Sequence, residues 1–262
     1  MTTRSGTIAS KAFLLKEMVV RDVRSRYAGS SLGILWAFAL PVLWMLLYTG
    51  VFSLVLRVPV DPNYASFPEF LMAGLLPWMA IQEGLSRSAS VLVDNAAMVK
   101  KTVFPVETLV LSVVLAAVVN ELIALAIFGV YVALVGHLSL AWLPLVLPAL
   151  LLQIAMTFGL GCIAATLTAF VRDAAHAVGI ALTVVFYATP IVYPASLVPE
   201  RLRPILEANP VAHLVDLYRR AFTLHAPPSA GSILYLTLFC GLAALLGAAL
   251  FARARPHFAD LI

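Results

Sequence analysis

The chain has 262 residues, of which 62% are hydrophobic and 11% are charged, and its mean hydropathy is +1.00. A soluble domain has about a quarter of its residues charged, so this chain has too few to cover a surface that faces water. Several apolar runs can cross about 30 Å of hydrocarbon at about 1.5 Å per residue, and they lack the alternation of β-barrel strands. The composition therefore predicts an all-α, polytopic membrane protein.

The formal net charge of +4 indicates orientation in the membrane rather than nucleic-acid binding, because Lys and Arg collect on the cytoplasmic side of membrane proteins. Cys162 and Cys240 lie inside apolar runs, which favours packing over a disulfide or a metal site. The sequence contains no phosphate-binding loop, no zinc-site spacing and no G-x-S-x-G elbow. We therefore expect no catalytic residue, no metal and no cofactor in this chain.

Residues 9–28 are predicted to form an amphipathic helix in the membrane interface. Apolar residues recur on one side at three- and four-residue spacing, and charged residues occupy the other, which suits the headgroup layer. A solvated helix that packs on another subunit is the alternative. The break at 28–31 is then an elbow into the apolar run that begins at Leu32. We expect residues 1–30 to form a cytoplasmic tail and interface helix, with anchoring residues Arg21, Asp22, Arg24, Arg26 and Tyr27.

The remaining residues, 31–262, are predicted to form one transmembrane domain with six spans. Pro41 should kink or loosen the first span, while Gly74 and Pro77 should make the second short and broken. Gly159 and Gly161 in the fourth are better explained by close helix packing than by a nucleotide turn. The predicted spans are about 32–56, 70–85, 106–135, 142–171, 174–193 and 232–252.

Six spans place both termini on one side of the membrane. That side holds 12 of the 17 Lys and Arg residues. The positive-inside rule therefore predicts that both termini are cytoplasmic.

Two parts of the sequence are not ordinary spans. Residues 194–228 are rich in proline and charge yet contain apolar patches, so they could form a loop or a pair of re-entrant helices. Asn120 and Glu121 lie near the middle of the third span, where a carboxylate suggests function by default. With one carboxylate and no relay, we favour a structural role, in which Glu121 is protonated or the pair hydrogen-bonds to a neighbouring helix near Gln153 or Thr157.

Five short motifs follow one another on this topology. They are RDVRSRY with LGILWA and Pro41 (21–41), FLMAGLLPW (70–78), NAAMVKK with FP (95–105), Arg172-Asp173, and Asn209-Pro210 with Arg219 or Arg220 about ten residues on. Together they resemble the type-2 ABC exporter permeases that carry bacterial surface polysaccharides. That family includes the O-antigen, capsular-polysaccharide and teichoic-acid exporters, and the resemblance covers nearly the whole chain.

The resemblance implies a homodimer of this permease in the bacterial inner membrane, docked on two copies of a separate ATPase. That partner would bind ATP and magnesium, so this chain would not itself be an enzyme. The implied cargo is a lipid-linked polysaccharide, with periplasmic export components as possible further partners. A drug or a small lipid is the alternative cargo. An intramembrane acyl- or glycosyltransferase ranks last, because we find no cluster of His, Asp or Ser near one membrane face.

Residues 92–105 resemble the coupling helix of that family, which sits in a groove of the ATPase and transmits its closure. A plain positive-inside loop is the alternative. The turn Arg172-Asp173 would be a second, smaller contact. The expected coupling residues are Asn95, Met98, Val99, Lys100, Lys101, Phe104, Arg172 and Asp173.

Aromatic residues of the first and fifth spans are the expected lining of the channel. Trp44, Tyr48 and Phe52 form a ridge at four-residue spacing, and aromatic rings can stack on the flat faces of sugars without a fixed register. Ordinary packing or an interfacial belt is the alternative, and we expect a belt for Trp78 and Trp142. The expected channel residues are Trp36, Trp44, Tyr48, Phe52, Phe186, Tyr187 and Tyr193, although Trp36 could instead contact lipid headgroups.

The segment 194–228 resembles the re-entrant helices of the family, which would form an outer gate. Its arginines could bind acidic sugars or a lipid-linked phosphate. Pairing with Glu200, Glu207 and Asp216 is the alternative. The expected gate residues are Arg201, Arg203, Asn209, Pro210, Arg219 and Arg220.

Overall fold

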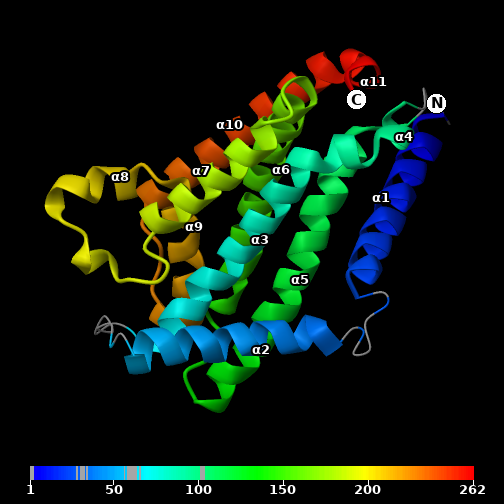
Figure 1. Cartoon of the computed structure of the whole chain (residues 1–262). Coiled ribbons are helices and arrows are strands. Elements are labelled where there is room, and N and C mark those ends of the chain that lie inside the picture. The colour runs from blue at the N-terminus through cyan, green and yellow to red at the C-terminus, as the bar shows by residue number, and fades with distance from the viewer. Residues whose placement is uncertain are drawn as a thin grey trace.

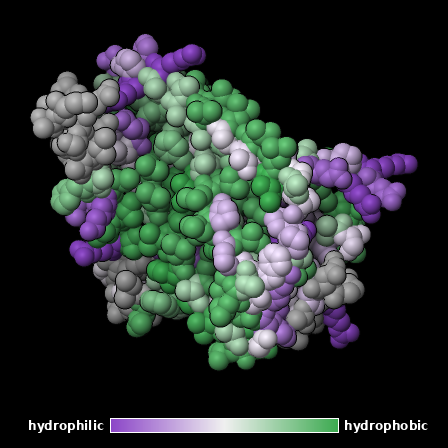
Figure 2. Space-filling model, turned by 180° about the vertical axis from the view of Figure 1, so that it is seen from behind, coloured by the Kyte–Doolittle hydropathy of each residue, from purple (hydrophilic) through white to green (hydrophobic). Residues whose placement is uncertain are grey.

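The computed structural model describes residues 3–27, 29, 33, 35–55, 57, 64, 66–100 and 104–262. These residues are overwhelmingly helical and contain no strand, which confirms the all-α fold class. Figure 1 shows long helices gathered into a bundle, with both chain ends and the short helix α4 at one end of it. Figure 2 shows that the opposite view is largely apolar, with the most hydrophilic groups at the periphery, as expected for a protein surrounded by lipid.

Each of the six predicted spans contains a helix. Within the described ranges, four stretches are long and apolar enough to cross a membrane: Leu35–Phe52, Glu107–Leu134, Leu143–Phe170 and Ala230–Leu261. The helices are α2 (Leu35–Thr49, continued by a π-helical turn, Gly50–Val55), α3 (Phe67–Asp94), α5 (Glu107–Leu134), α6 (Val146–Phe170), α7 (Ala174–Ala188) and α10 (Ala230–Ala254). The chain is therefore a multi-pass membrane protein with four candidate spans, because α3 is too polar and α7 too short to qualify on these grounds.

Helix α3 lies in the middle of the bundle and packs against α5, α6, α7 and α9. The expectation that this span is short and broken is wrong, because α3 runs without a break through Gly74 and Pro77. Gly74 instead permits α9 to approach α3 closely, since a Cβ at Gly74 would lie 3.1 Å from both Val215 Cγ1 and Arg219 Nη2. Neighbouring helices that cover α3 can compensate for the backbone hydrogen bond that Pro77 cannot donate.

Helices α6 and α10 touch backbone to backbone. A Cβ on Gly159 would overlap the backbone of Ala243, and a Cβ on Gly247 would overlap the carbonyl group of Gly159. Small residues permit this approach, which drives helix association in membranes through van der Waals contact. The packing role expected for Gly159 is thereby confirmed.

The N-terminal helix α1 (Thr3–Tyr27) packs lengthwise against α5, whereas α2 crosses the bundle (Figure 1). Met18 of α1 is buried, and its sulfur lies 3.8 Å from Thr108 Oγ1 of α5. Location at the membrane interface stays a prediction for α1. The predicted elbow, 28–31, lies outside the described residues except for Gly29, whose φ of +78° is one that glycine adopts without strain.

The segment between α7 and α10 contains two short helices, α8 (Arg203–Glu207) and α9 (Pro210–Arg219). Asn209 caps α9, since its side-chain oxygen accepts a hydrogen bond from the Val211 N–H at 3.0 Å, and Pro210 takes the first helical position. The apolar face of α9 is buried against α3, α6 and α10. The motif Asn209-Pro210 therefore starts a helix that the rest of the bundle covers.

Candidate functional site

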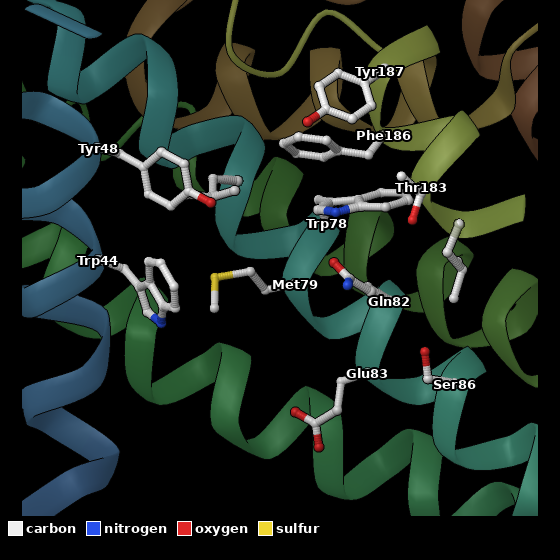
Figure 3. Close-up of a pocket in the computed structure, with 12 residues that line it drawn as sticks. Trp44, Tyr48, Trp78, Met79, Gln82, Glu83, Ser86, Thr183, Phe186 and Tyr187 are labelled. Carbon is white, nitrogen blue, oxygen red and sulfur yellow. The ribbon is translucent and has the colours of Figure 1, made fainter. Parts of the chain in front are cut away.

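A cavity of about 500 Å³ lies between α2, α3 and α7. Figure 3 shows aromatic rings converging on it from these helices: Trp44 and Tyr48 from α2, Phe186 and Tyr187 from α7, and Trp78 from α3. The structure thus brings together four of the seven predicted channel residues, although the two pairs are more than 130 positions apart in the sequence.

The rings form two connected runs. On α2, the ring centroids are 5.5 Å apart for Trp44 and Tyr48, and 6.0 Å apart for Tyr48 and Phe52, so the predicted ridge exists. Across the cavity, Trp78 and Phe186 lie 5.6 Å apart, and Phe186 and Tyr187 lie 5.2 Å apart with their rings edge to face. Such separations are typical of favourable aromatic pairs.

The accessibility of these rings differs. Tyr187 is 66% exposed and Trp44 is 37% exposed, so both offer a ring face to a ligand. Trp78 is only 2% exposed, so the interfacial belt expected for it is wrong: α7 covers its ring inside the protein. Phe52 extends the ridge away from the cavity toward Phe67, and the centroids of these two rings lie 6.1 Å apart. Tyr193 adjoins the cavity, because its hydroxyl donates to the Tyr187 carbonyl at 2.7 Å.

One face of α3 gives the cavity a polar side that the sequence analysis missed. Gln82, Glu83 and Ser86 line the cavity together with Thr183 of α7 (Figure 3). The four-residue spacing of Trp78, Gln82 and Ser86 was the available signal, because it places the three on one helix face. Aromatic faces beside hydrogen-bonding groups suit a ligand with apolar ring faces and many hydroxyls.

A smaller cavity of about 160 Å³ adjoins the first and shares Trp44, Met79 and Glu83 with it. Trp36 lines this cavity rather than the larger one, opposite Asn120 and Glu121 of α5.

Glu121 belongs to a buried polar network. Its Oε2 accepts a hydrogen bond from Gln153 Nε2 at 2.5 Å, and the Tyr218 hydroxyl donates to Gln153 Oε1 at 2.8 Å. The expected hydrogen bond from Glu121 to a neighbouring helix is confirmed for Gln153. The sequence analysis missed Tyr218, which joins α9 to α5 and α6.

The predicted gate arginines lie in and around α8 and α9. Arg219 is buried, donates to the Ile191 carbonyl at 3.1 Å, and holds its guanidinium 4.0 Å from the centre of the Phe70 ring. Arg219 and Arg203 line a cavity of about 460 Å³ that also contains Glu207, His213 and Asp216.

Two other gate arginines pair with acidic neighbours. Arg220 Nε lies 2.6 Å from Asp216 Oδ2, and Arg203 Nη1 lies 3.9 Å from Glu200 Oε1. The alternative of local pairing is thus confirmed for these two, whereas Arg201 is exposed to the surroundings.

The predicted coupling segment lies at the end of the bundle that holds both termini (Figure 1). Its helix, α4, comprises only Ala96–Val99, because α3 continues to Asp94. Asn95 ends α3, with its side-chain amide donating to the Val91 carbonyl at 2.9 Å. Met98 and Val99 turn toward the protein, Lys100 is exposed, and Lys101 lies outside the described residues.

The C-terminal segment packs against this region. Arg255 Nη2 donates to the Phe104 carbonyl at 3.3 Å, and Arg255 Nη1 lies 3.4 Å from Glu107 Oε2. Phe258 of α11 (Phe258–Leu261) is 1% exposed and belongs to the same apolar cluster as Val99. Helix α11 contacts both α4 and α6, so the exposed turn Arg172-Asp173 after α6 lies at this end too.

The predicted anchors of α1 divide into two groups. Asp22 forms a bidentate ion pair with Arg87 of α3, with Arg87 Nη1 donating to Asp22 Oδ2 at 2.8 Å. Arg21 and Arg24 are exposed, while the side chains of Arg26 and Tyr27 lie outside the described residues.

Comparisons with known proteins agree with this picture. The family model described as "ABC-2 type transporter" matches residues 14–223. The chain is similar to the O-antigen export system permease proteins RfbA of Klebsiella pneumoniae (33% identical over 256 residues) and Myxococcus xanthus (32% over 252). It is also similar to the polysialic acid transport protein KpsM of Escherichia coli (26% over 254). Each comparison covers 95% of this chain and 95% of the relative.

Proposed function

Since the chain belongs to the ABC-2 type transporter family, we propose that it is the permease subunit of an ATP-driven exporter of a lipid-linked surface polysaccharide in the bacterial inner membrane. Its relatives are named for O-antigen export and polysialic acid transport. Those names do not favour the alternative cargo, a drug or a small lipid.

The aromatic cavity between α2, α3 and α7 is the observation that carries this proposal. A sugar polymer presents flat apolar faces that can stack on successive rings, as bases do on single-strand binding proteins, and no single register is required. Trp44, Tyr48 and Tyr187 supply accessible rings. Gln82 and Ser86 supply hydrogen-bonding groups for the hydroxyls on the other side.

The same proposal includes a homodimer with six crossings per chain and cytoplasmic termini. The homodimer is supported by the large apolar surface of α2 and α7, on which Leu43, Leu47, Ile180 and Val184 are all more than half exposed. A second copy facing these helices would enclose the aromatic cavity as a path. Helices α8 and α9 would then form the re-entrant outer gate, with the buried Arg219 bracing α9 against α3.

The energy would come from a partner ATPase that binds ATP and magnesium and docks at α4 and at the turn Arg172-Asp173. Val99 and Phe258 belong to one apolar cluster that also includes buried residues of α1, α5 and α6. A rigid end of this kind can pass the closure of the ATPase to the spans as a rigid-body movement.

Deletion of the gene from its host tests the function. We expect surface polysaccharide to disappear, carrier-linked glycan to accumulate inside the cell, and plasmid-borne wild-type protein to restore the surface. Affinity purification should recover an ATPase with a phosphate loop. A deletion strain with its full surface polysaccharide would refute the proposed cargo.

A further inference from the structure

The turn that ends α7 follows from its own sequence. Pro190 cannot continue a helix, and it disfavours helical backbone in the residue before it. Thr189 is accordingly extended, with φ of −105° and ψ of 133°, and it is buried. Its hydroxyl donates to the Val185 carbonyl in the last turn of α7 at 2.7 Å. Because a hydroxyl has one proton, this oxygen can take part in a further hydrogen bond only as the acceptor.

Asn209, which starts α9, donates that further hydrogen bond. Its Nδ2 lies 2.8 Å from Thr189 Oγ1 and 3.4 Å from the Ala188 carbonyl oxygen. The helix cap determines the orientation of this amide, because Oδ1 accepts from the Val211 N–H and leaves Nδ2 to face α7. One side chain thus starts α9 and joins it to the end of α7.

The other end of α9 binds the same turn. Arg219 Nη2 donates to the Ile191 carbonyl at 3.1 Å, two residues beyond Thr189. Arg219 is 5% exposed, and its guanidinium also lies over the Phe70 ring of α3. Helix α9 therefore holds the turn after α7 at two points and is itself fixed to α3.

This turn directly follows the rings that α7 contributes to the aromatic cavity. Phe186 and Tyr187 belong to the last turn of α7, and Phe186 packs on Trp78 of α3 (Figure 3). The Thr189 N–H donates to the Phe186 carbonyl at 3.2 Å. A movement of the turn away from α9 would therefore carry both rings with it and change the width of the cavity.

We propose that Asn209 and Thr189 are positioning residues for transport, whose hydrogen bond holds α7 where its rings face the transported sugar. We call this hydrogen bond the α9–α7 clasp. Neither residue lines the aromatic cavity, so both act through Phe186 and Tyr187. The role of the clasp in transport rests on the proposed function, whereas its effect on the packing of Trp78 does not.

Quenching of Trp78 fluorescence tests the clasp without any cargo. The chain has four tryptophans, so replacement of Trp36, Trp44 and Trp142 by phenylalanine leaves Trp78 as the only one. Trp78 is buried beneath α7. The full-length permease in detergent is titrated with acrylamide, a small neutral quencher. One neutral hydrogen bond shifts an equilibrium by about fivefold, so loss of the clasp should raise the quenching constant about two- to fivefold.

Two substitutions break the clasp from opposite sides. Thr189→Val has nearly the same shape and removes the acceptor. Asn209→Ser keeps an N-cap of similar strength, but its shorter side chain lacks the amide donor. Both should raise quenching, and the double variant should raise it no further, because both remove the same bond. Thr189→Ser retains the hydroxyl and should behave as the wild type.

Thr166→Val is the matched control. Thr166 is buried in α6, and its hydroxyl donates to the Cys162 carbonyl four residues earlier at 2.8 Å, as that of Thr189 does to Val185. The control therefore loses the same local hydrogen bond but not the clasp, and its quenching should equal that of the wild type.

Transport measures the consequence for the cargo. Vesicles that contain the permease with its native tryptophans and its partner ATPase are supplied with increasing amounts of lipid-linked polysaccharide. Thr189→Val should raise the half-saturating concentration about two- to fivefold and leave ATP turnover without cargo unchanged, because fewer molecules hold the rings in place. A general loss of fold would instead lower ATP turnover as well.

The outcomes separate the clasp from the function. If Thr189→Val and Asn209→Ser are quenched no more than Thr166→Val, the clasp is wrong. Additive effects in the double variant would also overturn it, as would increased quenching with an unchanged half-saturating concentration. Should Thr189→Val fail to fold, Asn209→Ser decides. A deletion strain with normal surface polysaccharide would overturn the proposed function, and the quenching would still decide whether α9 holds α7.

Discussion

Asp22 of α1 holds Arg87 of α3 with both of its carboxylate oxygens. This ion pair ties the N-terminal helix to the central helix of the bundle. One turn earlier on α3, Glu83 lines both cavities and lies 3.4 Å from the same guanidinium. The N-terminal helix is thus connected to the wall of the candidate site through two side chains.

Asp22→Asn should lower the free energy of unfolding by about 1 kcal/mol, because the pair is bidentate but Arg87 remains about one-third exposed. Thermal denaturation in detergent measures the effect. Asp94→Asn is the control, since Asp94 is exposed and accepts a hydrogen bond from Ser90 on its own helix. Equal melting temperatures for the two variants would contradict a role for the ion pair in stability.

Trp44→Ala should reduce export about tenfold, because one stacking contact contributes about 1–3 kcal/mol. Trp44→Phe should retain most of the activity. The assay is surface polysaccharide per cell, normalised to permease in the membrane. Leu46→Ala serves as the control on the same helix, because Leu46 is 62% exposed and does not line the cavity. A Leu46 variant as defective as Trp44→Ala would indicate that the defect does not depend on the stacking surface of Trp44.

Phe258→Ala should uncouple the ATPase from the permease. The ring is buried, 5.0 Å from that of Phe251 and in one cluster with Val99, so its loss leaves a cavity directly behind α4. ATP turnover of the complex should fall to that of the ATPase alone, while the two proteins still co-purify. Leu261→Ala on the exposed side of α11 should have no effect. If the permease with Phe258→Ala still raised the ATP turnover of the ATPase as the wild type does, α4 would need no support from α11.

Gly159→Ala should destabilise the protein by about 1–3 kcal/mol, since the added methyl group overlaps the α10 backbone at Ala243 and the two helices must move apart. Gly241→Ala on α10 meets open space and should be neutral or slightly stabilising. The melting temperatures of the two variants in detergent make the comparison. Similar values would mean that the contact between α6 and α10 tolerates separation.

The sequence alone predicted the features that depend on local pattern. The apolar runs located the helices, the four-residue spacing located the ridge Trp44–Tyr48, and the isolated carboxylate of Glu121 implied a partner such as Gln153. The second half of α3 was misread, because the predicted span ended at residue 85 and left Arg87 outside it, whereas α3 continues to Asp94 and Arg87 pairs with Asp22 of α1.

Features that depend on long-range packing could not be predicted. Tyr218 reaches Gln153 only because α9 folds back between α3, α6 and α10. Trp78 looks interfacial in the sequence and is buried only because α7 covers it. The crossing of α2 over the bundle likewise depends on contacts with α3 and α5 rather than on its own residues.

The most direct test of the proposed function is transport by purified components. The permease and its partner ATPase are reconstituted together in vesicles with radiolabelled lipid-linked polysaccharide from the host, and the labelled glycan on each side of the bilayer is measured. We expect the glycan to move across the bilayer only when both proteins and hydrolysable ATP are present, and Trp44→Ala should reduce this movement about tenfold. Vesicles that hydrolyse ATP normally but leave the glycan on its original side would contradict the proposed function.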